Sequence, residues 1–337
     1  MPDPYAACLH IPRASTPPLC GVWPLNNHPA FDVPLKGDFA VIACHFNPAG
    51  YERPRRNMAV FLDWLWGQRV PVFMVELTFP GQKPVLPQKH PRVLQVQTSP
   101  DHSLWHKEGL LNLVPRIVPQ QFRKLAWIDA DVIIRQKQWY DRASKLLDQV
   151  NVVQLFSRAI YTNETGEECG MKPSVGYAAA NRDPRRADWK YYHCGFAWAA
   201  RRELWEQFGG LYHSIIGHGD TIIALAAMNA IDRDHTHIRP LNEAVWRAIQ
   251  DWSGPVANWT QGRLDCLPSD MVHLWHGDRA ARNYMGRLDY TRDLDPRTDV
   301  APNGHSGVIE WTRHALTRKP HMVKAVRGYF AERKEDG

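Results

Sequence analysis

Two aspartates interrupt an apolar stretch of the sequence, KLAWIDADVIIR, which runs from Lys124 to Arg135. The stretch is typical of a strand in the middle of a sheet, where one unpartnered carboxylate is strongly unfavourable and two are worse. In an extended backbone Asp129 and Asp131, at i and i+2, point to the same side. A divalent cation shared by both carboxylates would remove the repulsion and keep sites open for phosphate oxygens. The alternative is an exposed bend in which one of the acids caps a helix.

Short apolar strands are the elements that would position these aspartates. We expect strands over 38–46, 70–77, 92–97 and 124–134, and helices over 57–68 and 103–118. The order β-α-β-β-α-β, with continuously apolar strands, predicts a Rossmann-like α/β sheet that is covered on both faces. In open sheets of this class ligands bind outside the carboxyl ends of the strands, which is where the two aspartates stand.

The second half of the sequence is less regular. We expect strands over 151–156 and 270–277, with a long polar segment, 157–192, after the first of them. That segment would close over a ligand, grip a nucleic-acid backbone or remain a solvated loop. The cations and aromatic residues that favour the first two readings are Arg182, Arg185, Arg186, Trp189 and Tyr191. We divide the chain into an extended N-terminal arm (1–35), one α/β domain (36–285) and a basic helical tail packed on it (286–337).

Composition narrows the class of protein and of partner. The chain has 337 residues, a net charge of +6 and an isoelectric point near 9.0, which favours polyanionic partners such as nucleotides or nucleic acid. It has no apolar window long enough to cross a membrane and no basic-then-apolar N-terminal signal. Its six cysteines form no C-x-x-C pair, so free thiols in a reducing cytoplasm are expected ahead of disulfides or a zinc site.

Together with a segment farther along the chain, the D-x-D pair resembles that of the GT-A-fold glycosyltransferases, which use nucleotide-diphospho-sugars. In that family an apolar strand ends in D-x-D, as WIDADV does here. The segment HCGFAWAARRELWEQFGGLYHSIIGHGD, 193–220, is similar to one in β-1,4-galactosyltransferases and polypeptide N-acetylgalactosaminyltransferases. The resemblance implies a three-layer sandwich with a mixed, mostly parallel central sheet. It also implies that 195–199 lies along the donor sugar, that Gly209 and Gly210 form a turn, and that Asp220 faces the acceptor.

The same resemblance implies a metal site. Those families place a late histidine on the metal, and MVHLWHGDR, 271–279, offers His276 as the first choice and His273 as the second. On an extended strand these are i and i+3, so both cannot face one ion. Mn²⁺ or Mg²⁺ would be held by Asp129, Asp131 and His276, and it would bind the diphosphate of a nucleotide-sugar, expected to be UDP-linked.

Further residues are expected to contact that donor. They are His45, Phe46, Asn47, Glu76, Lys107, Asp129, Gly195 and Arg279. Glu76, at the end of the second strand, would accept from base or ribose hydroxyls, or else be an exposed strand-end acid. Lys107 and Arg279 would help to neutralise the diphosphate, although Lys107 can also be read as a solvated helix residue.

Asp220 is the expected general base of an inverting transfer, in which it takes the proton of the acceptor hydroxyl. Its alternative role is the N-cap of the helix TIIALAAM. This chain has GHGDT where the resembled families carry two or more adjacent acids, and a retaining enzyme would not need such a base. The sequence does not decide between inversion and retention.

The acceptor is addressed by a second resemblance. The segments HFNPAGYERPRRN, LWHKEGLLN and HLWHGDRAARNY resemble virus-type transferases of the TET/JBP-associated group, which implies 5-hydroxymethylpyrimidines in DNA as acceptors. The alternatives are a glycosyltransferase with a small-molecule, glycan or protein acceptor, a nucleotidyltransferase, and a non-catalytic nucleic-acid-binding module. A nucleotidyltransferase would need a third acid and a Gly-Ser phosphate loop, and neither is clear in this sequence.

Overall fold

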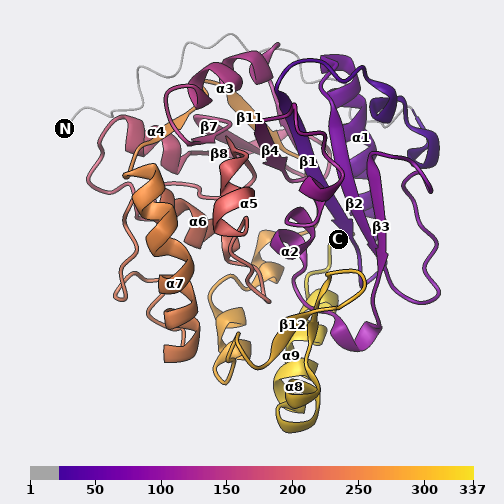
Figure 1. Ribbon diagram of the computed structural model, residues 1–337, viewed down its shortest axis with the longest axis vertical. Helices are drawn as coiled ribbons and strands as arrows, with labels where there is room; N and C mark the ends of the chain where they lie inside the picture. The colour runs from indigo at the N-terminus through magenta and orange to yellow at the C-terminus, as the bar shows by residue number, and fades with distance from the viewer. Residues whose placement is uncertain (1–22) are drawn as a thin grey trace.

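The protein, described from a computed structural model, is an α/β sandwich over residues 23–337 (Figure 1). The central sheet of these residues has seven strands in the order β10-β6-β9-β4-β1-β2-β3. Their bounds are β1 (Phe39–Phe46), β2 (Val72–Thr78), β3 (Val93–Gln97), β4 (Lys124–Ile128), β6 (Val152–Gln154), β9 (Ala197–Arg201) and β10 (Leu264–Cys266). Neighbouring strands run parallel except for β9, which is antiparallel to both β4 and β6. The predicted mixed, mostly parallel α/β sheet is confirmed.

Two apolar layers bury the faces of this sheet, because successive side chains of a strand alternate between its sides. On β1, Ala40 and Ile42 belong to one core cluster, while Val41 and Ala43 belong to the other. The helices are α1 (Glu52–Gln68), α2 (Lys107–Leu111), α3 (Trp139–Leu147), α4 (Val175–Ala180), α5 (Glu203–Phe208), α6 (Gly219–Ala227), α7 (Glu243–Thr260), α8 (Arg313–Arg318) and α9 (Pro320–Glu332). Helices α1 and α3 supply one layer, and α2, α5, α6 and α7 supply the other. The order β1-α1-β2-β3-α2-β4 is the one predicted.

A second sheet, with the order β5-β11-β7-β8, lies beyond the carboxyl end of β4. It consists of β5 (Val132–Ile134), β7 (Arg158–Thr162), β8 (Glu168–Pro173) and β11 (Asp270–His273). The expected single strand over 124–134 is therefore wrong, because its two halves belong to different sheets. The expectation of a long loop over 157–192 is also wrong, since β7, β8 and α4 lie within it.

Several element boundaries differ from the prediction for local reasons. Helix α1 starts at Glu52, ahead of Pro54, which the first turn of a helix tolerates because its amide would be unpaired there anyway. The expected helix over 103–118 shrinks to α2 and a 3-10 turn, Val114–Arg116. The expected strand over 270–277 ends at His273. Residues 1–22 of the proposed arm lie outside the described part, and of its remainder Ala30 and Phe31 are buried in the core.

The C-terminal segment is part of the same body. After the two-stranded sheet of β12 (Val300–Pro302) and β13 (Ile309–Trp311), α8 and α9 follow, and Val326 and Tyr329 of α9 are fully buried. The end of the chain then reaches the start of α1, where Asp336 accepts hydrogen bonds from the backbone amides of Glu52 and Arg53 at 3.1 and 2.7 Å. This places the last residues beside the carboxyl end of β1, and Figure 1 shows the C-terminus there.

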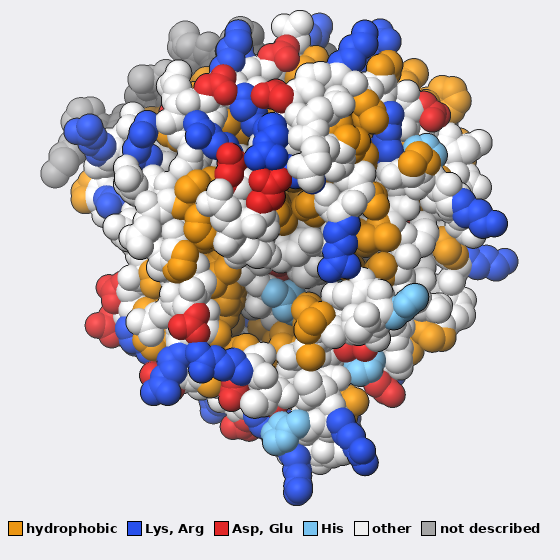
Figure 2. Space-filling model, in the orientation of Figure 1, with side chains coloured by type: hydrophobic (Ala, Val, Ile, Leu, Met, Phe, Trp, Pro, Cys, Tyr) orange, Lys and Arg blue, Asp and Glu red, His pale blue; other side chains and the backbone are white. Residues whose placement is uncertain are grey.

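None of the helices formed by residues 23–337 is long and apolar enough to cross a membrane. Lysine and arginine side chains are spread over the face drawn in Figure 2, in keeping with the net charge of +6. The same face is hollowed near its centre, where hydrophobic and histidine side chains are visible. The expected division at 285/286 stays a prediction.

Candidate active site

The D-x-D pair forms the turn between β4 and β5. Strand β4 ends at Ile128, and the amide of Val132 donates to the carbonyl of Asp129 at 3.3 Å across the turn. Because the backbone is not extended here, the two carboxylates meet different partners. Asp129 Oδ1 lies 2.7 Å from Lys107 Nζ, while Asp131 Oδ2 lies 2.8 Å from His276 Nε2. The expectation that both acids point to the same side is therefore wrong, because the turn directs Asp129 toward Lys107 and Asp131 toward His276.

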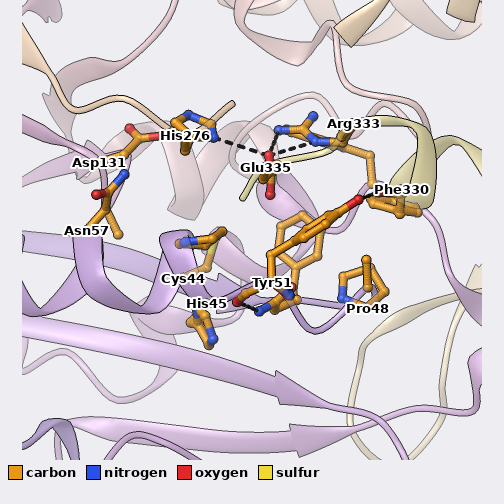
Figure 3. A pocket seen from close by; sticks show the side chains of 16 residues that line it. Cys44, His45, Pro48, Tyr51, Asn57, Asp131, His276, Phe330, Arg333 and Glu335 are labelled. Atoms are coloured by element: carbon orange, nitrogen blue, oxygen red, sulfur yellow. Dashed lines mark hydrogen bonds and ion pairs between the residues drawn. The ribbon is translucent and has the colours of Figure 1, made fainter. Parts of the chain in front are cut away.

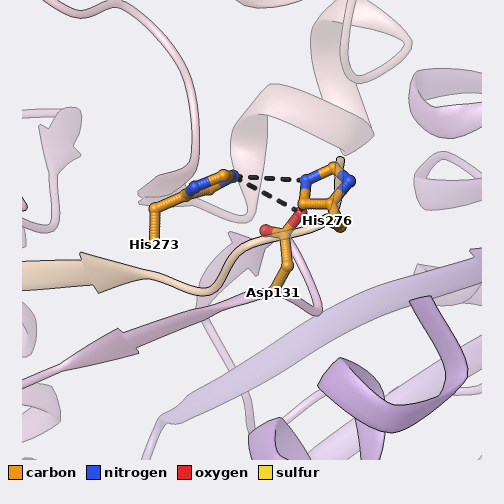
Figure 4. A group of neighbouring side chains, drawn as sticks. All are labelled: Asp131, His273 and His276. Atoms are coloured by element: carbon orange, nitrogen blue, oxygen red, sulfur yellow. Dashed lines mark hydrogen bonds and ion pairs between the residues drawn. The ribbon is translucent and has the colours of Figure 1, made fainter. Parts of the chain in front are cut away.

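Asp131 belongs to a group of three potential metal ligands, which it forms with His273 and His276 (Figure 4). One oxygen of Asp131 and one ring nitrogen each of His273 and His276 lie within 4.8 Å of one another. The prediction that both histidines cannot face one ion is wrong for a structural reason, because β11 ends at His273 and the chain turns before His276. The other oxygen of Asp131, Oδ1, is buried and has no hydrogen-bond partner. Two imidazoles and one carboxylate, of which one oxygen lacks a hydrogen-bond partner, fit a divalent cation.

The charges around this group keep Asp131 ionised, as a metal ligand must be, but they favour a proton on His276 that a metal would have to displace. Burial opposes the charge of Asp131, but His276, His273 and Arg282 together hold the pKa of Asp131 well below its usual range. Burial and Arg282 oppose protonation of His276, yet Asp131 and Glu335 raise its pKa above the ordinary value. A bound cation would replace the proton of His276 as the partner of Asp131.

The C-terminal segment completes the surroundings of His276. Glu335 Oε1 lies 3.3 Å from His276 Nδ1, and Arg333 forms an ion pair with the same carboxylate. Arg282 Nη2 lies 2.7 Å from His276 Nε2 and 3.1 Å from His276 Nδ1. No signal in the sequence pointed to the contacts of Arg333 and Glu335, which belong to a stretch without a recognisable motif, and Arg282 lies in HLWHGDRAARNY without having been singled out there.

A first cavity, which we call the Phe46 cavity, opens beside Asp131 (Figure 3). It has a volume of about 130 Å³ and is lined by Cys44, His45, Phe46, Asn47, Pro48, Ala49, Tyr51, Pro54, Asn57, Trp105, Ala130, Asp131, His276, Phe330, Arg333 and Glu335. Phe46 stands edge-on to Trp105 and Phe330. Burial lowers the pKa of His45 to about 4, so its ring is neutral at pH 7. The predicted contacts His45, Phe46 and Asn47 thus share one cavity with the metal-ligand group.

A second cavity, the Asp220 cavity, lies on the Asp129 side of the turn and has a volume of about 370 Å³. Trp105 and Arg333 line both cavities, so the D-x-D turn stands where the two meet. Its predicted members are Lys107, Asp129, Gly195 and Asp220. A β-carbon on Gly195 would lie 3.0 Å from Asp220 Oδ2, so only glycine lets β9 approach this carboxylate so closely.

Lys107 joins the two acids of the Asp220 cavity. Its Nζ lies 2.7 Å from Asp129 Oδ1 and 3.2 and 3.0 Å from the two oxygens of Asp220. Burial opposes its charge, but Asp129, Asp220 and Glu108 raise the pKa of Lys107 well above its ordinary value. The reading of Lys107 as a solvated helix residue is wrong, since it is 6% exposed.

Glu108 is a buried acid of this cavity that the sequence did not single out. It is 1% exposed, and its Oε2 has no hydrogen-bond partner. Burial, against the opposing effect of Lys107, raises the pKa of Glu108 to about 8, and for the same reasons that of Asp129 to about 7. A β-carbon on Gly219 would lie 2.4 Å from Glu108 Oε1, so α6 must start with glycine to admit this side chain.

The remaining predicted residues have mixed outcomes. Asp220 lies in the first turn of α6, but the N-cap is His218, so the N-cap alternative for Asp220 is wrong. Gly209 and Gly210 form the predicted turn, with φ of 75° and 89°. For Arg279 the structure describes the backbone, within the 3-10 turn Arg279–Arg282, and its predicted contact with the diphosphate stays a prediction.

Glu76 is neither at a cavity nor exposed. It is 1% exposed, and its carboxylate accepts from the amides of Val85 and Leu86 at 2.8 and 3.0 Å and from Gln95 Nε2 at 2.8 Å. The exposed-acid alternative is therefore wrong. The carboxylate holds the loop after β2 in place. Glu76 lines neither the Phe46 cavity nor the Asp220 cavity, so the structure does not place it with the other predicted donor contacts.

Among known proteins, the chain is similar to several solved structures. No protein-family model and no curated protein matches the chain. Glucosyl-3-phosphoglycerate synthase from Mycobacterium tuberculosis, in complex with Mn²⁺, UDP-glucose and phosphoglyceric acid, is 13% identical, with a TM-score of 0.35 over 81% of this chain and 85% of that one. Its complex with Mg²⁺ and UDP gives 11% identity and a TM-score of 0.36 over 84% and 90%. A mycobacterial protein is 11% identical, with a TM-score of 0.37 over 86% of this chain and 91% of that one.

Proposed function

We propose that the protein is a metal-dependent glycosyltransferase that moves a sugar from a UDP-linked donor to an acceptor hydroxyl. The observation that carries this proposal is the place of the D-x-D turn between two cavities. On one side Asp131 stands with His273 and His276, and on the other Asp129 and Asp220 share Lys107. Such an arrangement suits a reaction in which a diphosphate departs on one side and a hydroxyl loses its proton on the other.

The donor would bind in the Phe46 cavity with its diphosphate at Asp131. Phe46, Asn47 and Tyr51 offer an aromatic and amide lining suited to a base, while Asp131, His273 and His276 would hold Mn²⁺ or Mg²⁺. When bound, the cation supplies Lewis-acid stabilisation of the charge that grows on the leaving diphosphate. Asp129 was also predicted as a ligand, and in that role it would have to exchange Lys107 for the cation.

Arg282 is the cation that this chain offers to the diphosphate in addition to the metal. It is 7% exposed, lines the Asp220 cavity and lies against His276. Among the described residues no carboxylate makes an ion pair with it. Asp131 acts on this guanidinium only from beyond ion-pair distance, and a phosphate oxygen at hydrogen-bond distance would compensate the buried charge more fully.

Asp220 is the residue that we assign as general base. In an inverting transfer the acceptor oxygen forms a bond to the anomeric carbon, the bond from that carbon to the diphosphate oxygen breaks, and the hydroxyl proton passes to Asp220. Lys107 Nζ donates to both oxygens of this carboxylate and so orients it. Nucleotide diphosphate and glycosylated acceptor are then the products.

For the acceptor we propose a 5-hydroxymethylpyrimidine in DNA. The net charge of +6 supports a polyanionic acceptor. Trp189 lines the Asp220 cavity, and Tyr191 next to it is 37% exposed and carries the guanidinium of Arg185 at 4.7 Å from its ring. Aromatic and cationic side chains of this kind stack on bases and contact the backbone of a single strand or a flipped nucleotide.

The test is a thermal-shift screen of nucleotide-sugars with and without Mn²⁺. We expect a UDP-sugar to raise the melting temperature only when the metal is present, and Asp131→Ala to abolish that shift and sugar transfer while the variant stays folded. Asp141→Ala, an exposed acid on α3, is the matched control and should behave like the wild type. If Asp131→Ala binds UDP in the presence of metal as well as the wild type does, the proposal is refuted. Transfer to hydroxymethylated DNA is read by mass spectrometry of nucleosides.

A further inference from the structure

Arg287 is a buried arginine for which the proposed donor site has no use. It lies in the 3-10 turn Gly286–Thr291, lines the Asp220 cavity and is 6% exposed. Its Nη1 donates to the hydroxyl of Tyr329 at 2.7 Å, and its guanidinium stands over the rings of Tyr284 and Tyr329 at 5.1 and 5.7 Å. Among the described residues it has no carboxylate in ion-pair contact, and its Nε has no partner.

The groups around Arg287 do not balance its charge. Besides the two tyrosines, Arg287 acts on His218 and His237, whose rings lie 5.4 Å apart, and Lys172 also acts on His237. All three line the same cavity as Arg287. Burial and the nearby cations lower the pKa of both histidines, so they are neutral at pH 7. Arg287 is thus a buried cation of this cavity that has no carboxylate in ion-pair contact among residues 23–337, while the acids Asp129 and Asp220 are paired with Lys107.

Arg287 lines the same cavity as the candidate base and lies against the segment that leads into α6. A β-carbon on Gly217 would lie 3.2 Å from three atoms of the Arg287 guanidinium, so the segment before α6 packs directly on it. Asp220 follows three residues later, in the first turn of the same helix. The N-terminal end of α6 adds positive potential to this wall of the cavity. His218, at the N-cap, has a buried Nε2 without a partner.

We infer that Arg287, with Lys172 and the start of α6, forms an anion subsite that holds the acceptor by a phosphate group while its hydroxyl lies at Asp220. An isolated buried cation is unfavourable, and a phosphate would supply the missing counter-charge. The inference rests on the proposed transfer in assigning the ligand to the acceptor, whereas the anion site itself does not depend on it. A free nucleotide and a phosphate of a DNA strand offer the same chemistry.

The first experiment measures the binding of inorganic phosphate by calorimetry in the presence of EDTA, where no metal site competes. We expect Arg287→Gln to weaken phosphate binding about tenfold or more, and Arg292→Gln to leave it unchanged, because that side chain is 71% exposed. Arg287→Lys, which keeps the charge, should retain part of the affinity. In wild-type protein phosphate should shift the imidazole NMR signals of His218 and His237, which tests the subsite even if a variant folds poorly.

The outcomes separate this inference from the proposed function. Binding of UDP with Mn²⁺, measured on each variant, reports the donor site and should not change in Arg287→Gln. If UDP binds but phosphate binds equally well to Arg287→Gln, or if Arg282→Gln abolishes phosphate binding in its place, the inference is overturned and the donor site stands. Transfer to 5-hydroxymethyl-dCMP and to an oligonucleotide then shows which source of phosphate is used, and Arg287-dependence of KM in either supports the subsite.

Discussion

Glu108 allows a quantitative prediction about how stability depends on pH. Its carboxyl is buried, and its pKa is raised from 4.5 to about 8. An acid whose pKa is higher in the folded than in the unfolded state stabilises the fold below the unfolded pKa, and this contribution is lost as the pH rises through the folded pKa. Above the ordinary histidine pKa of about 6.5 the buried neutral histidines add progressively less to the pH dependence, and what they add is common to the wild type and a Glu108 variant.

The magnitude follows from the fraction of protonated Glu108. Between about pH 6.5 and about pH 8 the unfolded chain binds almost no proton at this group, while the folded chain goes from nearly full to half protonation. At about 1.4 kcal/mol for each pH unit and bound proton, the fold loses on the order of 1 to 2 kcal/mol over this range. Glu108→Gln keeps the shape of the side chain against Gly219 and removes the titration, so its stability should lack this part of the pH dependence.

The assay is urea unfolding of the metal-free protein at both pH values, for the wild type, Glu108→Gln and the control Glu164→Gln. The control replaces an acid whose side chain is 67% exposed, and it should follow the wild type. The remaining dependence, which all three proteins share, comes from Asp129, from His276 and from the buried neutral histidines such as His45. If Glu108→Gln loses as much stability as the wild type between the two pH values, Glu108 is ionised in the fold and the reasoning is refuted.

Two further predictions concern a carboxylate beside the metal ligands, Glu335, and a structural carboxylate, Glu76. Glu335→Gln should weaken Mn²⁺ binding about 10- to 100-fold, because a carboxylate on the far nitrogen of a ligating histidine orients the ring. Electron paramagnetic resonance titration of Mn²⁺ measures this, and an unchanged affinity would contradict it. Glu76→Ala should lower the free energy of unfolding by about 3 kcal/mol, since the buried amides of Val85 and Leu86 lose their acceptor. UDP binding, followed in parallel, should persist.

The part of the fold that could be predicted is the part with local signals. Strands β1 to β4 and their order followed from apolar runs, because both faces of a central sheet are buried and its strands have no polar side. The turn at Gly209 and Gly210 followed from glycine, which adopts positive φ without strain. Segment 157–192 was missed because β8 is largely exposed at the edge of the small sheet and has a polar sequence.

Residues of the site that come from distant parts of the chain could not be predicted in the same way. Glu335 meets His276 across 59 positions, and Arg287 meets the start of α6 through a close approach at Gly217. Such contacts leave no periodicity or spacing in the sequence. Glu108 did leave a trace, since a Lys-Glu pair at the start of a helix is ordinary on a surface, but this helix is apolar on its other positions and must be buried.

The D-x-D turn shows how an electrostatic problem can be posed by the sequence and solved only in three dimensions. Two acids after a buried strand repel one another, and an extended backbone would have required one cation to serve both. The turn separates them, so that Asp129 faces a lysine and Asp131 faces two histidines. Lysine is a permanent cation, whereas histidine can give up its proton to a metal. The side with the exchangeable partner is therefore where a metal would enter, and the side with the fixed cation is where Lys107 would hold in place the carboxylate that takes the acceptor's proton.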